Sequence, residues 1–285
     1  MNGTRPVTVV VPTIGRADLV ESCLVSLAAC EPRAAEVIVA DQSGRDEVRQ
    51  VAKRFESLGV RLLTLDVRSK PLALNLALEE AGNEVVLVTD DDCTVDPAWV
   101  GAGWAAMSVD PEALVTGRVL PAGEPSAVPS TIDEAAPRDY TGTLHYGALY
   151  GGNMACNRTL VLAFGGFDPR FEAAEDNDLC YRWLRAGRSL RYEPDLIVWH
   201  HAWRSPAELV LNYRAYGHGQ GVFYAKHLRR GDLRVAPFLL RDLYRGARGV
   251  AAQLVRGRPA WPDPRTGLLR GVVVGLVHGL RSRPR

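Results

Sequence analysis

The chain has 285 residues, of which 47% are hydrophobic, and we favour one large α/β domain with an appendage over two small domains. Its formal net charge of +1 hides an asymmetry, because residues 1–225 carry a net −10 and residues 226–285 carry fourteen Lys/Arg against three Asp/Glu. A nucleic acid needs a basic groove along its contact surface, so the acidic first part argues against nucleic acid as the main partner. Only the basic tail could serve a polyanion or an anionic bilayer.

The cysteines and the apolar runs bear on the cellular location. Five cysteines, without any CxxC pair, indicate buried free thiols rather than a disulfide framework or a zinc site. The apolar run at residues 7–11 is too short for the core of a signal peptide, and no stretch reaches the roughly 18 uncharged residues that a spanning helix requires. The sequence therefore predicts a cytoplasmic protein.

The first 120 residues alternate between short β-branched apolar runs and longer runs with helical spacing. The apolar runs predict buried strands at residues 7–11, 37–40, 61–65 and 85–89. The longer runs predict helices at residues 17–30, 45–58, 71–82 and 97–108. This order predicts an α/β fold with a mostly parallel sheet covered by helices on both faces, and a ligand crevice at the carboxyl ends of the strands.

Polar and charged groups gather where the predicted strands end. Pro12 and Thr13, Asp41, Lys70 and the run Asp90 to Asp92 all occupy such positions, and a nucleotide fits this kind of edge. Residues 120–149 are rich in Pro, Ala, Gly and Ser and show little periodicity. That composition predicts a mobile loop over the crevice or a crossing between two halves.

Three adjacent carboxylates, Asp90 to Asp92, close an apolar run. They repel one another and resist burial, so a fold tolerates them at a strand end chiefly when a hard cation such as Mg²⁺ or Mn²⁺ neutralises them. The alternative is a solvated acidic turn that caps the next helix. Asp96 and Pro97 already supply that helix start, which favours the metal.

Two later segments also carry groups suited to catalysis. Glu175 and Asp176 are expected in the first turn of a helix, which fixes a carboxylate well enough to act as a general base, although composition alone favours a plain helix-start charge. His200 and His201 end an apolar run, and an imidazole beside carboxylates suits Mn²⁺ better than Mg²⁺. A histidine satisfied in the core or at the surface is the alternative.

The ordered set of these segments resembles the family 2 glycosyltransferases of the GT-A fold, an inverting group. The matching pieces are VVVPTIGR at 9–16, VIVADQS at 37–43, KPLALN at 70–75, DDD at 90–92, GGN at 151–153, EDNDL at 175–179 and His200. Together they are far more specific than any single piece.

The resemblance implies that Asp41 accepts a hydrogen bond from the ring N–H of a uracil-like base and that Asp91, or Asp90, holds the ribose. Other contacts to the nucleotide sugar would come from Pro12, Thr13, Lys70 and Asn75. Leu74 stands where many members have Arg, and Ala40 replaces a common Asp. Both departures loosen the inference about which nucleotide is used.

The resemblance also implies the chemical roles. Asp92 and His200 would bind the Mn²⁺ or Mg²⁺ that bridges the phosphates, with His200 preferred to His201 because the family pattern resembles His-x-x-Trp-Arg, here ending at Arg204. Asp176 would be the base. The acceptor and sugar region would include Gly152, Asn153 and Glu175.

The implied reaction is a single displacement with inversion from a UDP or dTDP sugar to an acceptor hydroxyl on a carbohydrate, a lipid-linked sugar or a small molecule. Two alternatives stay open. A sugar nucleotidyltransferase would need a glycine-rich phosphate loop after the first strand, of which residues 12–16 are a poor version. A non-catalytic nucleotide-sugar or glycan binding protein would not need Asp92, Asp176 and His200 together.

We expect a nucleotide-sugar-binding half at 1–120, an acceptor and catalytic half at 121–204, and a basic helical extension at 205–285. In the extension, Gly267, Gly271, Gly275 and Gly279 recur every fourth residue among apolar residues. Small residues at this spacing permit close helix packing, and basic amphipathic helices bind anionic membrane surfaces. We expect peripheral attachment at the inner face of the cell membrane, with packing on the catalytic domain as the alternative.

Overall fold

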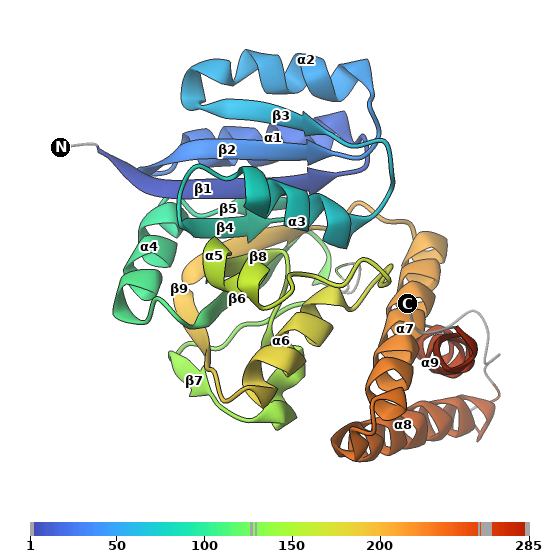
Figure 1. Ribbon diagram of the computed structural model, residues 1–285. Coiled ribbons are helices and arrows are strands. Elements are labelled where there is room, and N and C mark those ends of the chain that lie inside the picture. Colours follow the sequence, from blue (N-terminus) through green and yellow to red (C-terminus); the bar gives the residue numbers. More distant parts are fainter. Residues whose placement is uncertain (1–2, 126–127, 129, 256, 258–263, 283–285) are drawn as a thin grey trace. The chain divides into compact units, whose positions relative to one another are not determined.

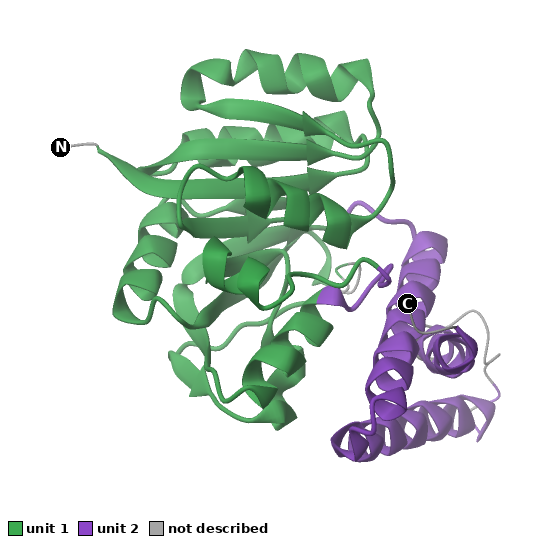
Figure 2. Cartoon of the chain, in the orientation of Figure 1, with its two compact units in different colours: residues 1–169, 176–202 green, residues 170–175, 203–285 purple. Residues whose placement is uncertain are grey.

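The computed structural model describes residues 3–125, 128, 130–255, 257 and 264–282. The chain divides into two compact units, which Figure 2 colours separately. Unit 1 comprises Met1–Pro169 and Asp176–Ala202, and unit 2 comprises Arg170–Glu175 and Trp203–Arg285. The boundary proposed at residue 120 falls inside a strand of unit 1, so the two expected halves share one sheet, and their separate functions stay a prediction.

The first half of the sheet is parallel, as the apolar runs predict. Its strands are β1 (Thr4–Thr13), β2 (Arg33–Asp41), β3 (Val60–Thr64) and β4 (Val85–Thr89), in the spatial order β3-β2-β1-β4. The connecting helices are α1 (Ala17–Ala28), α2 (Asp46–Arg54) and α3 (Lys70–Glu80), with a short 3₁₀ turn, η1 (Glu56–Leu58), before β3. These positions agree closely with the predicted elements.

The second half of the sheet is mixed. β8 (Asn153–Asn157) pairs antiparallel with β4, followed across the sheet by β6 (Leu114–Ala122) and β9 (Leu190–His201), which are parallel to each other. The far edge of β9 pairs with β5 (Cys93–Val95) and β7 (Arg138–Tyr140). The sheet is thus less parallel than predicted, because β5 and β7 have only three residues each and β8, NMACN, lacks a β-branched apolar run. Part of the predicted loop at 120–149 is ordered as β7 and η3 (Thr143–Ala148).

Helices cover both faces of the sheet (Figure 1). Because side chains alternate along a strand, Val7, Val9 and Val11 of β1 enter one core shared with α1, α2 and α4 (Trp99–Val109). On the other face α3 packs against β1 and β2, and α5 (Arg158–Ala163) packs against α3. Helix α6 (Glu175–Arg185) has Glu175 and Asp176 in its first turn, as expected.

Unit 2 consists of α7 (Pro206–Arg229), the 3₁₀ turn η4 (Leu233–Val235), α8 (Ala236–Val255) and α9 (Pro264–Arg281). Helix α7 starts with a capping box, in which Ser205 and Glu208 satisfy each other's backbone N–H groups. None of the described helices is long and apolar enough to cross a membrane.

The four-residue glycine repeat packs α9 against α7. A Cβ at Gly275 would lie 2.0 Å from the carbonyl oxygen of His218, and one at Gly271 would lie 2.3 Å from that of Arg214. On the facing helix, a Cβ at Gly221 would lie 2.2 Å from the carbonyl oxygen of Val272. The repeat therefore serves close helix packing inside unit 2.

Candidate active site

The carboxyl ends of neighbouring parallel strands bring the predicted nucleotide contacts together. Thr13 ends β1 and Asp41 ends β2, and the two are direct partners in the strand register. Thr89 ends β4, the other neighbour of β1, and the acidic triplet follows it immediately. The edge predicted from the sequence is therefore one continuous row of polar groups.

Asp41 is fully buried, and only one of its two carboxylate oxygens accepts hydrogen bonds from described residues. Its Oδ1 atom accepts hydrogen bonds from the backbone N–H of Ser43 at 2.9 Å and from the Ser43 hydroxyl at 2.6 Å. Its Oδ2 atom has no hydrogen-bond partner among the described residues. Because an unpaired buried acceptor is costly, this oxygen suits a donor supplied by a ligand.

The first two carboxylates of the triplet have different cationic partners. Lys70, the first residue of α3, places its Nζ atom 2.6 Å from Oδ1 of Asp90. Asp91 accepts hydrogen bonds from the Thr13 hydroxyl at 2.6 Å and from Nε of Arg16 at 2.9 Å, and its other oxygen contacts Nη2 of Arg16. Burial raises the pKa of Asp91 to about 6, and the Arg16 charge opposes that rise.

Arg16 is a site residue to which the sequence assigned no role. Besides its two-point contact with Asp91, its Nη1 atom lies 3.8 Å from Oδ2 of Asp92. Gly15 makes the preceding turn possible, because its φ is +97° and a Cβ there would lie 2.7 Å from Oγ of Ser43. The only sequence signal was a basic residue after a glycine at the end of the first strand.

Asp92 and His200 form a pair that fits a divalent cation. Both are 2% exposed, and Nε2 of His200 lies 3.6 Å from Oδ2 of Asp92. Nδ1 of His200 contacts the Tyr150 hydroxyl at 3.1 Å, whereas Nε2 has no hydrogen-bond partner among the described residues. A buried nitrogen facing a carboxylate, with its other nitrogen held by a second group, is the usual arrangement of a metal-binding histidine.

Among the described residues, no further His, Cys, Asp or Glu side chain completes this pair into a metal site with three ligands. Across the described part of the chain, no group of three or more His, Cys, Asp or Glu residues is placed to hold a metal. A cation held by Asp92 and His200 would thus need further oxygens from a ligand, which a diphosphate supplies. His201 instead contacts the Thr94 hydroxyl at 3.0 Å through Nε2.

Asp176 lies in the first turn of α6, as expected, and its carboxylate is held by backbone groups. Its Oδ2 atom accepts a hydrogen bond from the N–H of Gly151 at 3.1 Å, and Oδ1 accepts one from the N–H of Asn177 at 2.8 Å. Burial raises the pKa of Asp176, while the charge of Lys70 and the two backbone hydrogen bonds act in the opposite direction. The nearby charge of Asp90 adds to the rise.

Two glycines join the candidate base to the acidic triplet. A Cβ at Gly151 would lie 3.2 Å from Oδ2 of Asp176, and a Cβ at Gly152 would lie 2.5 Å from Oδ2 of Asp90. Any larger residue at 152 would push the Asp90 carboxylate away. The backbone at Gly152, expected in the acceptor and sugar region, therefore lies against Asp90.

The side chains of Asn75 and Asn153 are both hydrogen-bonded within the fold. The Asn75 amide binds both the N–H and the carbonyl of Phe167, at 2.8 and 2.7 Å. Asn153 is fully buried and accepts from the Trp99 indole at 2.8 Å, while its amide nitrogen donates to two backbone carbonyls, at 2.9 and 2.8 Å. Both amides thus make hydrogen bonds within the fold, and the ligand contacts expected of Asn75 and Asn153 stay a prediction.

Hydrogen bonds of Asp178 and Arg182 hold α6 in place. Asp178 is fully buried and accepts a hydrogen bond from Nε of Arg182 at 2.8 Å. Arg182 also donates to the carbonyls of Phe164 and Gly166, at 3.0 and 2.6 Å. Just before the helix, Ala174 has a φ of +65°, a left-handed conformation that disfavours residues other than glycine. Glu175, which follows it, is buried.

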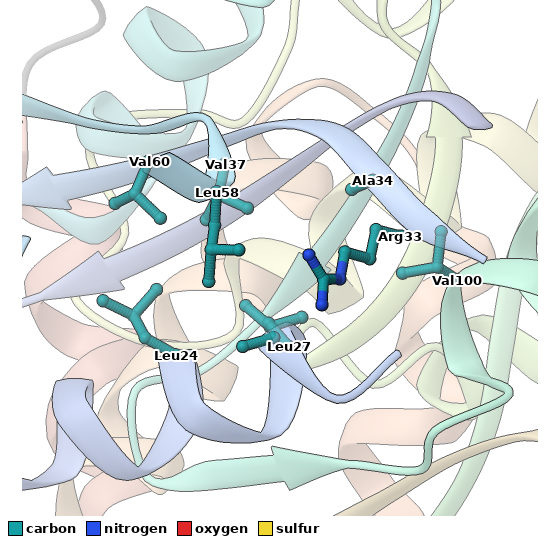
Figure 3. A pocket seen from close by; sticks show the side chains of 9 residues that line it. Leu24, Leu27, Arg33, Ala34, Val37, Leu58, Val60 and Val100 are labelled. Atoms are coloured by element: carbon teal, nitrogen blue, oxygen red, sulfur yellow. The ribbon is translucent and has the colours of Figure 1, made fainter. Parts of the chain in front are cut away.

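An apolar recess elsewhere in unit 1 is distinct from this site (Figure 3). Leu24, Leu27 and Val100 line it together with Arg33, the first residue of β2. Asp41 ends the same strand, about 26 Å away at the usual rise per residue. The recess lies at the amino-terminal end of β2, away from the carboxylates.

Comparisons with known proteins identify the family of the chain. The model of the family described as Glycosyl transferase family 2 matches residues 8–158. Succinoglycan biosynthesis protein ExoA from Rhizobium meliloti (strain 1021) is 25% identical over 241 residues, which cover 79% of this chain and 72% of ExoA. Pre-mycofactocin glycosyltransferase from Mycobacterium tuberculosis (strain ATCC 25618 / H37Rv) is 26% identical over 234 residues, covering 78% of this chain but only 48% of that protein.

Solved structures share the fold. Mannosyltransferase PcManGT from Pyrobaculum calidifontis, in complex with GDP-Man and Mn²⁺, matches with a TM-score of 0.65 at 19% identity, over 98% of this chain and 88% of that one. S. aureus TarS 1–349 in complex with UDP-GlcNAc matches with a TM-score of 0.60 at 17% identity, over 79% and 72%. These likenesses confirm the predicted GT-A type fold. Since the family model matches more than half of the sequence, the chain belongs to glycosyl transferase family 2 and is a glycosyltransferase.

Proposed function

We propose that the chain transfers a sugar from a UDP or dTDP sugar to an acceptor hydroxyl, with inversion at the anomeric carbon. The observation that carries this proposal is the two-glycine link described above. Gly151 donates its N–H to Asp176, and Gly152 lies against Asp90, so the base and the acidic triplet border one backbone segment. A donor bound at the triplet would thus present its sugar near Asp176.

The nucleotide would be held along the row of strand ends. The spare oxygen of Asp41 would accept the ring N–H of uracil or thymine, with Pro12 and Thr13 beside it. Asp91 or Asp90 would bind the ribose, and Lys70 would lie near the phosphates. PcManGT was solved with GDP-Man and TarS with UDP-GlcNAc, so related folds accept different bases.

Asp92 and His200 would hold a divalent cation, Mn²⁺ or Mg²⁺, together with the diphosphate. When bound, the cation would stabilise the negative charge on the departing diphosphate, a contribution of several kcal/mol. Nε2 of His200, buried and without a partner among the described residues, is what supports this assignment. The Tyr150 hydroxyl would keep that imidazole in place.

Asp176 would remove the proton from the acceptor hydroxyl as the oxygen attacks the anomeric carbon. A general base of this kind contributes about 10²- to 10⁴-fold to the rate. Burial favours the role, because a raised pKa makes the carboxylate a stronger base. No covalent enzyme intermediate is required.

The acceptor would be a carbohydrate, a lipid-linked sugar or a small molecule, and the protein would act in the cytoplasm at the inner face of the cell membrane. The net +11 of residues 226–285 supports this location.

A direct test is the release of nucleoside diphosphate from a panel of nucleotide sugars, with a mixture of simple glycosides as acceptors and Mn²⁺ present. The donor is found first by thermal shift, since a ligand at 100 times its Kd stabilises the fold by about 2.7 kcal/mol. Acceptor-dependent turnover by the native chain is expected. Donor binding without any transfer or hydrolysis would identify a binding protein instead.

A further inference from the structure

The outward face of α8 carries an apolar stripe that the described part of the chain does not cover. Leu240, Tyr244 and Leu254 are 65%, 65% and 63% exposed, and Ala247 and Ala251 between them are exposed as well. These five positions follow the 3–4-residue spacing of one helix face. The helix face that these five residues form is therefore apolar over several turns, whereas the exposed face of a solvated helix carries polar residues.

A row of arginines runs beside the stripe. Arg241, Arg245 and Arg248 each follow a stripe residue by one position, which places them about 100° round the helix, and all three are exposed. The single acidic residue of α8, Asp242, accepts a hydrogen bond from the Tyr224 hydroxyl of α7 at 2.5 Å and an ion pair from Arg241 at 3.3 Å. The stripe and its flank thus contain three cations, of which Arg241 is paired with Asp242, the one carboxylate of this helix.

The opposite face of α8 does the packing within unit 2. Phe238 is 6% exposed, and a Cβ at Gly246 would lie 2.8 Å from the Leu269 side chain of α9. Together with the Tyr224 contact to Asp242, these positions define the inner face. The stripe is therefore not a core surface of this helical unit.

We propose that the stripe and the arginine row form a docking surface for an anionic lipid bilayer, with α8 lying in the plane of the membrane. Apolar side chains on one face would enter the acyl boundary, and the arginines beside them would reach the lipid phosphates. A second copy of the chain fits less well, because it would bring six arginines into one interface, and the one carboxylate of α8, Asp242, already pairs with Arg241 in each copy. The proposal rests on the membrane location proposed above and names the surface that provides it.

Cosedimentation of the full chain with lipid vesicles tests this surface. The native protein should bind vesicles of phosphatidylglycerol and phosphatidylcholine, bind pure phosphatidylcholine less, and be released by salt. Replacing Arg241, Arg245 and Arg248 by Gln should weaken binding on the order of 100-fold, since each basic residue near such a surface contributes about fivefold. The pair Leu240→Gln and Leu254→Gln should weaken binding by roughly tenfold or more.

Matched variants control for charge and for exposed apolar area. Arg49, Lys53 and Arg54 of α2 are exposed, so their replacement by Gln removes the same charge from another helix. Val25 and Val109, 55% and 70% exposed, are the apolar counterparts for Gln substitution. These controls should bind vesicles as the native protein does. Equal losses in controls and α8 variants, or native binding by the α8 variants, would overturn the proposal.

Two further readouts separate the possible outcomes. All five native cysteines are buried, so Leu240→Cys can be labelled with an environment-sensitive dye, whose emission should shift to the blue on anionic vesicles. If sedimentation velocity shows a native dimer that the Leu240 and Leu254 variant converts to a monomer, the stripe is an interface between copies. The α8 variants should transfer sugar to a soluble acceptor at the native rate. If the native protein itself shows no transfer to a soluble acceptor, the proposed function is contradicted, whereas the membrane-docking surface is not.

Discussion

The backbone N–H of Gly151 donates to Oδ2 of Asp176, and a Cβ at residue 151 would lie 3.2 Å from that oxygen. The segment of Gly151 and Gly152, which also lies against Asp90, thus holds in place the carboxylate that we propose as the base. The contact also lowers the pKa of Asp176 against the effect of burial. The position and the basicity of this carboxylate therefore depend in part on the backbone at Gly151.

We expect Asp176→Asn to reduce the transfer rate by about two to four orders of magnitude with little change in donor affinity, because only the proton acceptor is lost. Single-turnover kinetics and calorimetric donor titration measure the two quantities separately. Asp18→Asn, on the exposed start of α1, is the control and should be silent. Near-normal turnover would place the base elsewhere, with Glu175 the first residue to test.

The pH profile of kcat should reflect the raised pKa of Asp176. The base must be ionised, so activity falls as pH drops through that pKa, and the acidic limb should lie above the ordinary value of about 3.9. Lys70→Gln removes a charge that lowers this pKa, so the limb should move to higher pH. Profiles at saturating donor test the direction; an unmoved or lowered limb contradicts it.

Metal-dependent donor binding should require Asp92 and His200. We expect Asp92→Asn or His200→Gln to abolish the Mn²⁺-dependent part of UDP affinity, and Tyr150→Phe to weaken it about tenfold, as losses behind a metal-binding histidine do. His201→Gln is the matched control, because its imidazole contacts Thr94 instead. Calorimetry with UDP, with and without Mn²⁺, is the measurement. Unchanged Mn²⁺ dependence in both ligand variants would remove the metal assignment.

The pairing of Arg16 with buried Asp91 should contribute to stability. Arg16→Met leaves a buried carboxylate without its cation and should cost on the order of 3 kcal/mol in unfolding free energy. Combining it with Asp91→Asn should restore part of that loss. Arg54→Met, which breaks an exposed pair with Glu21, should change stability by less than about 1 kcal/mol. Urea denaturation of the native protein, the single variants Arg16→Met and Asp91→Asn, and the double variant gives the coupling energy, and additive effects of the two single substitutions would contradict the prediction.

The packing of α9 on α7 predicts that substitutions at Gly275 and Gly267, two glycines of the four-residue repeat, differ in their effect on stability. Gly275→Ala would place a methyl group 2.0 Å from a backbone oxygen and should destabilise the protein by about 1–3 kcal/mol. Gly267→Ala has its nearest contact at 3.2 Å, and helix propensity should offset the slight crowding. Thermal unfolding distinguishes them; equal melting temperatures would mean that the two helices are not so close.

Local patterns in the sequence were sufficient to predict the parallel half of the sheet and the polar residues at the ends of its strands. Thr13, Asp41 and the acidic triplet were found because each follows an apolar run. The amides of Asn75 and Asn153 could not be placed in this way, since Asn75 binds Phe167, 92 positions away, and Asn153 binds Trp99, 54 positions away. The two-point contact of Arg16 with Asp91, 75 positions away, was hidden for the same reason.

The ladder between β5 and β9 has a consequence for the candidate metal pair. Cys93, the residue after Asp92, is the direct register partner of His200. A slip of one residue between these strands would exchange His200 for His201 and turn the imidazole to the opposite side of the sheet. Asp92 lies in the turn just before β5, and its carbonyl accepts a hydrogen bond from the N–H of His201 at 2.9 Å, so backbone hydrogen bonds help to set the spacing of carboxylate and imidazole. Such a pair is preorganised, so capturing an ion would cost little ordering entropy on the protein side.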